Sequence, residues 1–199
     1  MAPLLLLSLL AVYACIERFI VLTKQTSFSK KWLHKVYDLV AQGKLQEAVA
    51  ACNARKTAIA RVLEKGLQSL IKHTASSLSK EEVAIVEKPM MTAWHYILPN
   101  LEKNTSLLST IAAIAPMLGF LGTVLGMIKA FYSLSTTTSV VPQQLLAGGI
   151  YEAMITTAAG LIVGLIAEIG LRYCITRINT TAKRIDQATS RLVELLNLT

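Results

Sequence analysis

The stretch NTSLLSTIAAIAPMLGFLGTVLGM, residues 104–127, decides the organisation of the chain together with GGIYEAMITTAAGLIVGLIAEI, residues 148–169. The first stretch has no charged residue, and the second is interrupted only by Glu152 and Glu168. A bilayer core of about 30 Å needs roughly 20 apolar residues in a helix. Each stretch is therefore long enough to span a membrane.

Both stretches carry small residues at intervals of three and four, on or near one helical face. The positions are Ala115, Gly119, Gly122, Thr123 and Gly126 in the first, and Ala153, Thr157, Gly160 and Gly164 in the second. Such small-residue stripes let helix backbones approach closely in a membrane. Because Thr123 and Thr157 lie within the stripes, we expect a tight bundle whose hydroxyl groups line one polar interior surface.

Composition also favours a membrane protein. The chain of 199 residues is 53% hydrophobic and 16% charged, whereas soluble domains are about 25% charged. Its cysteines, Cys15, Cys52 and Cys174, lie far apart and lack the spacing of a metal site. We therefore interpret them as reduced packing residues, and we expect neither a bound metal ion nor a cofactor.

The net charge of +8 is distributed as in a membrane protein. Residues 23–103 hold thirteen Lys and Arg against seven Asp and Glu, residues 170–199 hold five against two, and residues 131–151 hold no charge. Basic residues on one side of membrane spans mark the cytoplasmic side. Topology therefore explains the basic character, and we do not expect nucleic acid as a partner.

We predict an all-α membrane protein with three transmembrane helices and long helices that extend into the cytoplasm. The predicted segments are a first transmembrane helix at 1–22 with its N-terminus outside, a cytoplasmic helical region at 23–103, a second transmembrane helix at 104–132, a short periplasmic loop at 133–147, a third transmembrane helix at 148–171 and a cytoplasmic amphipathic helix at 172–199. Near the end of the first span, Glu17 and Arg18 either lie at headgroup level, with Arg18 snorkelling, or indicate that native N-terminal residues are missing.

The cytoplasmic region shows the apolar spacing of short amphipathic helices. We predict a helix that ends near Gly43, a second over 45–54 and a third over 58–72. The helical pattern that starts within 77–88 continues into the second span. It predicts either one long helix or a helix that Pro89 and Pro99 kink or break.

Charged residues within spans are the candidates for chemistry, because burying them in a bilayer is unfavourable. Glu152 is either an interfacial carboxylate near a helix N-terminus or an acid at the mouth of an ion path. Glu168 is better explained as a snorkelling carboxylate, or one paired with another subunit. Thr123 and Thr157 could each bond a backbone carbonyl one turn back or line the interior. Since no nucleophile, base or phosphate loop is apparent, we expect no enzyme.

The segments APMLGFLGTVLGMIKAF, residues 115–131, and GGIYEAMITTAAGLIVGLIA, residues 148–167, resemble the two signature spans of the MotA/TolQ/ExbB proton-channel family. ERF at 17–19 and GKLQEAVAACNA at 43–54 are also similar to that family. The resemblance covers essentially the whole chain. Three spans fit the ExbB and TolQ branch better than the four-span MotA branch.

The resemblance implies a ring-shaped homopentamer in the bacterial inner membrane. The ring would surround the single transmembrane helices of an ExbD-like or TolR-like partner, whose aspartate takes up and releases protons. The partner would then deliver work to a TonB-like or TolA-like protein. By resemblance, the channel-lining threonines correspond to Thr123 and Thr157, and the glutamate of the last span corresponds to Glu152. The sequence departs from many members at Ile166, where they have proline, and at Glu168, an additional carboxylate.

We therefore expect a proton-channel or stator subunit that energises TonB-dependent outer-membrane transport. The alternatives are a TolQ-like subunit for envelope maintenance, a motility stator, and a non-conducting membrane scaffold. The residues expected to act are Thr123, Thr157 and Glu152 in the proton path, with Glu168 as a possible extra carboxylate. Helix packing is assigned to Ala115, Gly119, Gly122, Gly126, Gly160 and Gly164.

Overall fold

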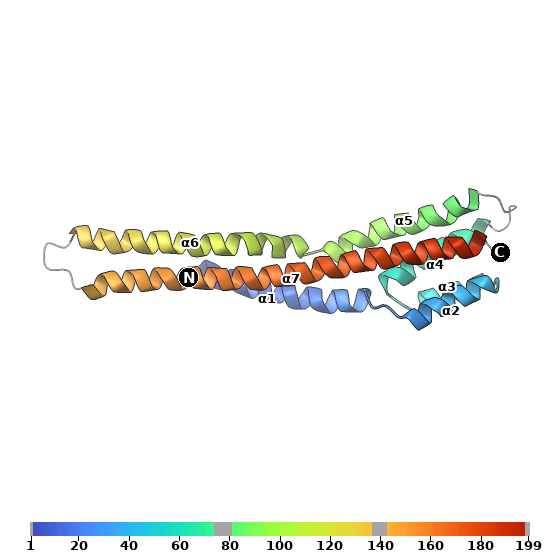
Figure 1. The fold of residues 1–199 in the computed structure, drawn as a ribbon, viewed down its shortest axis with the longest axis horizontal. Coiled ribbons are helices and arrows are strands. Elements are labelled where there is room, and N and C mark those ends of the chain that lie inside the picture. The colour runs from blue at the N-terminus through green and yellow to red at the C-terminus, as the bar shows by residue number, and fades with distance from the viewer. Residues whose placement is uncertain (1, 74–80, 137–142, 198–199) are drawn as a thin grey trace. The chain divides into compact units, whose positions relative to one another are not determined.

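The computed structural model describes residues 2–73, 81–136 and 143–197, and every regular element within these ranges is an α-helix. The helices, labelled in Figure 1, are α1 (Ala2–Gln25), α2 (Lys30–Ala41), α3 (Leu45–Asn53), α4 (Ala58–His73), α5 (Glu81–Glu102), α6 (Thr105–Thr136) and α7 (Gln143–Asn197). Three helical stretches among the described residues are long and apolar enough to cross a membrane: Pro3–Ala41, Ile85–Ser135 and Leu146–Leu196. The all-helical prediction with three candidate spans is thus confirmed.

The chain divides into two compact units. The first, which we call the span unit, comprises Met1–Arg18 and Asn104–Tyr173. The second, the helical unit, comprises Phe19–Lys103 and Cys174–Thr199.

The span unit contains most of α1, all of α6 and the first part of α7. Its buried core is formed by small and branched side chains of all three helices: Ala11, Ile111, Ala115, Val163 and Ala167. The core is thin, since only 22%, 17% and 28% of the residues in the most apolar windows of the three spanning stretches are buried within the chain. Large apolar side chains such as Met117, Phe120 and Leu165 are exposed. These surfaces need lipid or other protein chains to cover them.

The helices of the span unit run further than the sequence predicted. Helix α6 continues through Thr136 and α7 begins at Gln143, so both enter the predicted loop at 133–147; residues 137–142 of that loop lie outside the described residues. Helix α7 then continues as one helix through the predicted boundary at 171/172. No glycine or proline follows Gly170 within α7, so nothing in the local sequence ends the helix there.

In the helical unit, α2 ends as predicted at a glycine. Gly43 has φ of 72°, its N–H donates to the Val40 carbonyl at 2.9 Å, and the Lys44 N–H donates to the Leu39 carbonyl at 2.9 Å. This pair of bonds is a Schellman motif, which favours glycine at the left-handed position. The next helices, α3 and α4, agree with the predicted ranges within one residue.

Partly buried polar contacts join helices of the helical unit. The Trp32 indole N–H donates to the Ala51 carbonyl at 3.1 Å, and the Tyr37 hydroxyl donates to the Ala188 carbonyl of α7 at 3.3 Å. Cys52 is fully buried on α3, and this burial, assisted by the charge of Glu64, raises the pKa of its thiol to about 12. The interpretation of Cys52 as a packing residue agrees with that environment.

The predicted break at the prolines is wrong, because α5 continues through both Pro89 and Pro99; the alternative, a kink, stays a prediction. A proline removes the hydrogen bond to the carbonyl four residues earlier. For Pro89 that carbonyl belongs to Ile85, and it accepts a hydrogen bond from the Ser69 hydroxyl of α4 at 3.0 Å. The helix breaks instead between α5 and α6, where Asn104 has φ of 61°. The alternative of one continuous helix into the span is therefore also wrong, and the predicted start within 77–80 lies outside the described residues.

Candidate functional site

A close backbone approach in the span unit joins α6 to α7, which run side by side and antiparallel (Figure 1). At the centre, Gly119 lies against Gly160. A Cβ atom added to Gly160 would lie 2.6 Å from the Ala115 carbonyl oxygen and 2.8 Å from the Gly119 Cα. Only glycine allows the two backbones to come this close.

The same contact continues along both helices with small residues on each side. Its further pairs are Gly126 with Ala153, Gly122 with Thr156, and Gly164 with Pro116. All of the residues assigned to helix packing from the sequence therefore lie in this one contact. We call it the glycine contact.

Thr157 connects the two helices directly. Its hydroxyl donates to the Gly119 carbonyl oxygen at 3.1 Å, across the glycine contact, and the residue is half-buried. The predicted alternative of a bond within its own helix therefore does not hold for Thr157. With its hydrogen committed to Gly119, the Thr157 oxygen can offer only its lone pairs to a further group.

Thr123 does bond within its own helix. Its hydroxyl donates to the Phe120 carbonyl at 2.6 Å, and its side chain lines a shallow cavity of about 510 Å³ on α6 together with Val124, Met127, Ile128 and Phe131. The hydrogen of this hydroxyl is therefore also committed to the backbone. Both candidate threonines present hydrogen-bond acceptors.

The two candidate carboxylates have different surroundings. Glu152 is exposed on α7, one position before Ala153 of the glycine contact. Glu168 accepts a hydrogen bond from Arg172 Nε at 2.7 Å, one turn along the same helix. The two residues have the favourable spacing of four positions within α7; the expected snorkelling or intersubunit pairing of Glu168 stays a prediction.

Charged side chains are absent from the middle of the glycine contact. Among the described residues of α6 and of α7 up to Glu168, the charged residues are Lys129, Glu152 and Glu168, and none of them is a glycine-contact residue. Within the described ranges, no three His, Cys, Asp or Glu side chains form a group that could hold a metal ion. The groups that can act chemically at this contact are hydroxyls and backbone carbonyls.

Thr156 also belongs to the glycine contact, although it was not among the residues predicted to lie there. This residue is 9% exposed, its hydroxyl donates to the Ala153 carbonyl at 2.6 Å, and its side chain packs against Gly122. A signal was available, because Ala153, Thr156 and Gly160 also follow the three-and-four spacing of a helical stripe.

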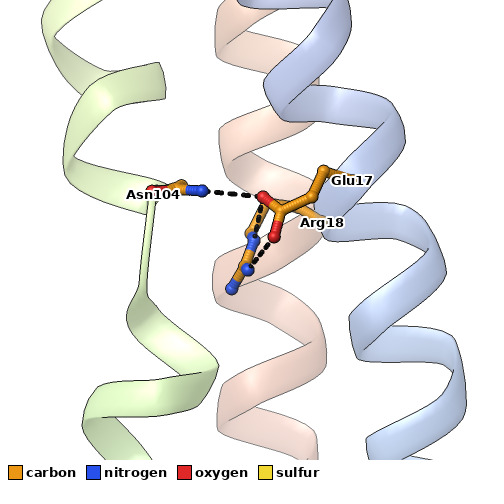
Figure 2. Close-up of polar contacts among 3 residues, drawn as sticks. All are labelled: Glu17, Arg18 and Asn104. Carbon is orange, nitrogen blue, oxygen red and sulfur yellow. Dashed lines mark hydrogen bonds and ion pairs between the residues drawn. The ribbon is translucent and has the colours of Figure 1, made fainter.

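A second polar cluster in the span unit joins α1 to the start of α6 (Figure 2). Arg18 donates to the Glu17 carboxylate through Nε at 3.1 Å and Nη2 at 2.5 Å, and the Asn104 side-chain amide donates to Glu17 Oε2 at 2.7 Å. Arg18 is 2% exposed. The expectation that Arg18 snorkels is therefore wrong, since its guanidinium is enclosed by the protein and paired.

Comparison with known proteins matches residues 54–187 to the MotA/TolQ/ExbB proton channel family. An ExbB-like biopolymer transport protein of Synechocystis sp. is 33% identical over 181 residues, which cover 88% of this chain and 66% of the relative. The biopolymer transport protein exbB1 of Vibrio cholerae is 47% identical over 32% of this chain and 28% of its own length. The Tol-Pal system protein TolQ of Haemophilus influenzae is 34% identical over 46% of this chain and 40% of its own length. The chain thus spans less than two thirds of the length of each of these relatives.

Proposed function

We propose that this chain, which belongs to the MotA/TolQ/ExbB proton channel family, is the channel subunit of an inner-membrane complex that energises TonB-dependent outer-membrane transport. The family and the three apolar helices make it a multi-pass membrane protein. The ExbB-like relative that covers 88% of the chain supports the ExbB branch. The role proposed is conduction and energy transfer, without enzymatic catalysis.

The observation that carries the proposal is the pair of threonine hydroxyls with committed hydrogens. Thr157 donates to Gly119 and Thr123 donates to Phe120, so each hydroxyl oxygen can accept a hydrogen bond from a protonated group. A protonated carboxylic acid is such a donor, whereas a carboxylate is not. The two threonines would therefore stabilise the neutral form of an acid that carries a proton through the membrane.

That acid must come from a second chain, because no charged side chain lies in the glycine contact. An ExbD-like or TolR-like single-span protein with an aspartate in its span fits this requirement. We propose that it binds inside a homo-oligomeric ring, a pentamer by resemblance, and transmits work to a TonB-like protein. The exposed apolar side chains of the span unit support a ring, since one chain buries few of them.

For the orientation, we propose a periplasmic N-terminus and a cytoplasmic C-terminus. Residues 174–199 carry four Lys and Arg (Arg177, Lys183, Arg184 and Arg191) against Asp186 and Glu194. Basic segments next to spans are retained in the cytoplasm. Protease protection of a C-terminal tag in inverted and right-side-out vesicles tests this orientation.

The proposal is tested with two substitutions at one position. Thr157→Val keeps the shape of the side chain and removes the hydroxyl, whereas Thr157→Ser keeps the hydroxyl. Co-expressed with the partner, both variants should give the same assembly in native mass spectrometry as the parent chain. Proton flux should be lost in Thr157→Val and retained in Thr157→Ser. Equal flux in both would remove the hydroxyl from the path, and a monomer that ignores the partner would favour a non-conducting scaffold.

The similarity to TolQ gives a second candidate function, envelope maintenance. Complementation separates the two. Expression with the cognate partner in cells that lack ExbB should restore TonB-dependent uptake, and expression in cells that lack TolQ should leave their detergent sensitivity unchanged. The reverse result would assign the chain to the Tol system.

A further inference from the structure

We propose that Glu17, Arg18 and Asn104 form an anchor that fixes the position of α6 along its axis. By doing so, the anchor places the Gly119 carbonyl opposite Thr157. The inference deepens the proposed function, because the hydrogen bond between these two residues is the feature on which that function rests. Glu17 and Arg18 would act as positioning residues.

The first step is the geometry of the anchor, drawn in Figure 2. Adjacent residues on a helix do not normally face one another, yet Glu17 and Arg18 pair through two hydrogen bonds. Arg18 is 2% exposed, and a buried guanidinium requires a charged partner held in good geometry. The pairing in turn orients the Glu17 carboxylate so that Oε2 also accepts the Asn104 amide at 2.7 Å.

The second step is the role of Asn104 in the backbone. Among the described residues it is the only one other than glycine with positive φ, at 61°, a conformation that asparagine tolerates better than most residues. Its carbonyl accepts the Leu108 N–H at 3.2 Å, which is a first-turn hydrogen bond of α6. One residue therefore both begins α6 and is held by α1 through its side chain.

The third step concerns the register of α6 along α7. The α6 side of the glycine contact has small residues at Ala115, Gly119, Gly122 and Gly126, about one turn apart. A shift of α6 by one turn, about 5.4 Å, would bring Ala115 to the place of Gly119, where an added Cβ lies 3.1 Å from the Gly160 Cα, or Ala130 to the place of Gly126, where it lies 2.9 Å from the Ala153 Cβ. The glycine contact therefore opposes the shift, and the anchor opposes it further, because the shift would separate Asn104 from Glu17 and break their hydrogen bond.

The fourth step is that α1 itself packs against α7. Gly170 packs so closely on Cys15 that an added Cβ would collide with its Sγ atom. Ala11 shares the buried core with Val163 and Ala167 of α7. Anchoring α6 to α1 therefore also sets the register of α6 against α7.

Disulfide cross-linking of the full chain in membranes tests the anchor. In a background with Cys15→Ala, Cys52→Ala and Cys174→Ala, the pair Ala130→Cys with Gly149→Cys reports the observed register, because these two positions face each other, with a Gly149 Cβ 2.8 Å from the Ala130 Cβ. The helix ends must separate by about 1 Å to reach the Cβ separation of a disulfide, about 3.5–4.5 Å, so each anchor variant is compared with the same cysteine pair in the parent sequence. Two further pairs report a one-turn shift in either direction. They combine Gly149→Cys with Gly126→Cys or with Ser133→Cys.

Into each reporter we would introduce Glu17→Gln, Asn104→Gly or Asn104→Asp. Asn104→Gly keeps the left-handed backbone accessible and removes only the amide. The ratio of in-register to shifted product should fall about tenfold or more in both Asn104 variants, as expected for loss of one hydrogen bond to a charged group. It should fall by a smaller factor in Glu17→Gln, because the glutamine oxygen is uncharged but can still accept one hydrogen bond. The matched control is Asn179→Asp on an exposed position of α7, which should leave the ratio unchanged.

Several results would overturn the inference. The inference is wrong if a folded anchor variant gives the same ratio of in-register to shifted product as the parent chain, even with a lower melting temperature, because the cluster would then only add stability. It is also wrong if the Asn179→Asp control changes that ratio as much as the anchor variants do. If Glu17→Gln fails to accumulate, Asn104→Gly decides. The assay needs neither partner nor proton flux, so failure of the anchor and failure of the proposed function are separate results.

Discussion

Replacing Gly160 with alanine should destabilise the contact between α6 and α7. The new Cβ would lie 2.6 Å from the Ala115 carbonyl oxygen, 2.8 Å from the Gly119 Cα and 3.0 Å from the Gly119 nitrogen. All three are backbone atoms, so no side chain can rotate away to make room. The helices must separate, which also lengthens the hydrogen bond from Thr157 to Gly119, 3.1 Å in the structure.

The magnitude follows from three terms, two of which destabilise the contact and one of which stabilises the helix. Overpacking of this kind costs about 1–3 kcal/mol, and the lost interhelical hydrogen bond adds about 0.6 kcal/mol in a membrane. Glycine to alanine within a helix returns about 1 kcal/mol. Gly148→Ala on the same helix is the matched control, because a Cβ there meets nothing within 4 Å. Both variants share the helix-propensity gain, so their difference isolates the packing term.

Unfolding of the purified chain by sodium dodecyl sulfate in mixed micelles, followed by circular dichroism, measures this difference. We expect Gly160→Ala to be less stable than Gly148→Ala by about 1.5–3.5 kcal/mol, the sum of the packing and hydrogen-bond terms. Gly148→Ala should be at least as stable as the parent. Equal stability of the two variants would refute the close backbone approach on which the site depends.

Further predictions concern both units. Stability should fall as pH rises from 9 to 10, by about 1.4 kcal/mol per pH unit, because burial raises the pKa of the Cys52 thiol to about 12 in the folded chain and the unfolded chain therefore loses its proton first. Denaturation of Cys52→Ala should lack this slope over the same interval, which lies below the range in which tyrosine and lysine side chains titrate. Ser69→Ala should destabilise the helical unit by about 1 kcal/mol. In a Pro89→Ala background the loss should be much smaller, because the Ile85 carbonyl regains its helical hydrogen-bond partner. A double-mutant cycle that shows no coupling between Ser69 and Pro89 would contradict this. Glu152→Gln should leave the stability of the chain unchanged, since Glu152 is exposed, but it should reduce proton flux in the presence of the partner. Unchanged flux would mean that Glu152 is only an interfacial residue.

Much of the span unit could be predicted from local sequence, for a physical reason. Length and hydropathy determine which segments can cross a bilayer, and residue size determines which face of each helix can approach another. The stripes through Gly119 and Gly160 therefore indicated residues that the structure brings together. The short helices of the helical unit followed from apolar spacing and from Gly43 at a helix end.

Several of the features that were predicted wrongly depend on partners distant in sequence. Pro89 does not interrupt α5, because Ser69 of another helix satisfies the carbonyl that proline leaves unpaired. The break occurs at Asn104, whose side chain is held by Glu17, 87 residues earlier. Arg18 is enclosed for the same reason. The spacing of apolar residues along one helix carries no information about such contacts. The low helix propensity of proline was therefore the only local signal for a break.

Proton flux through liposomes is the most direct test of the claim that this chain is a channel subunit that requires a second chain. The parent chain would be reconstituted alone and with its single-span partner, and uptake of protons would be followed with an internal pH dye under a potassium diffusion potential. The account predicts flux only when both chains are present, because the glycine contact offers hydroxyls but no charged group that could carry the proton. The same flux from the chain alone, or none from an intact complex of both chains, would contradict it.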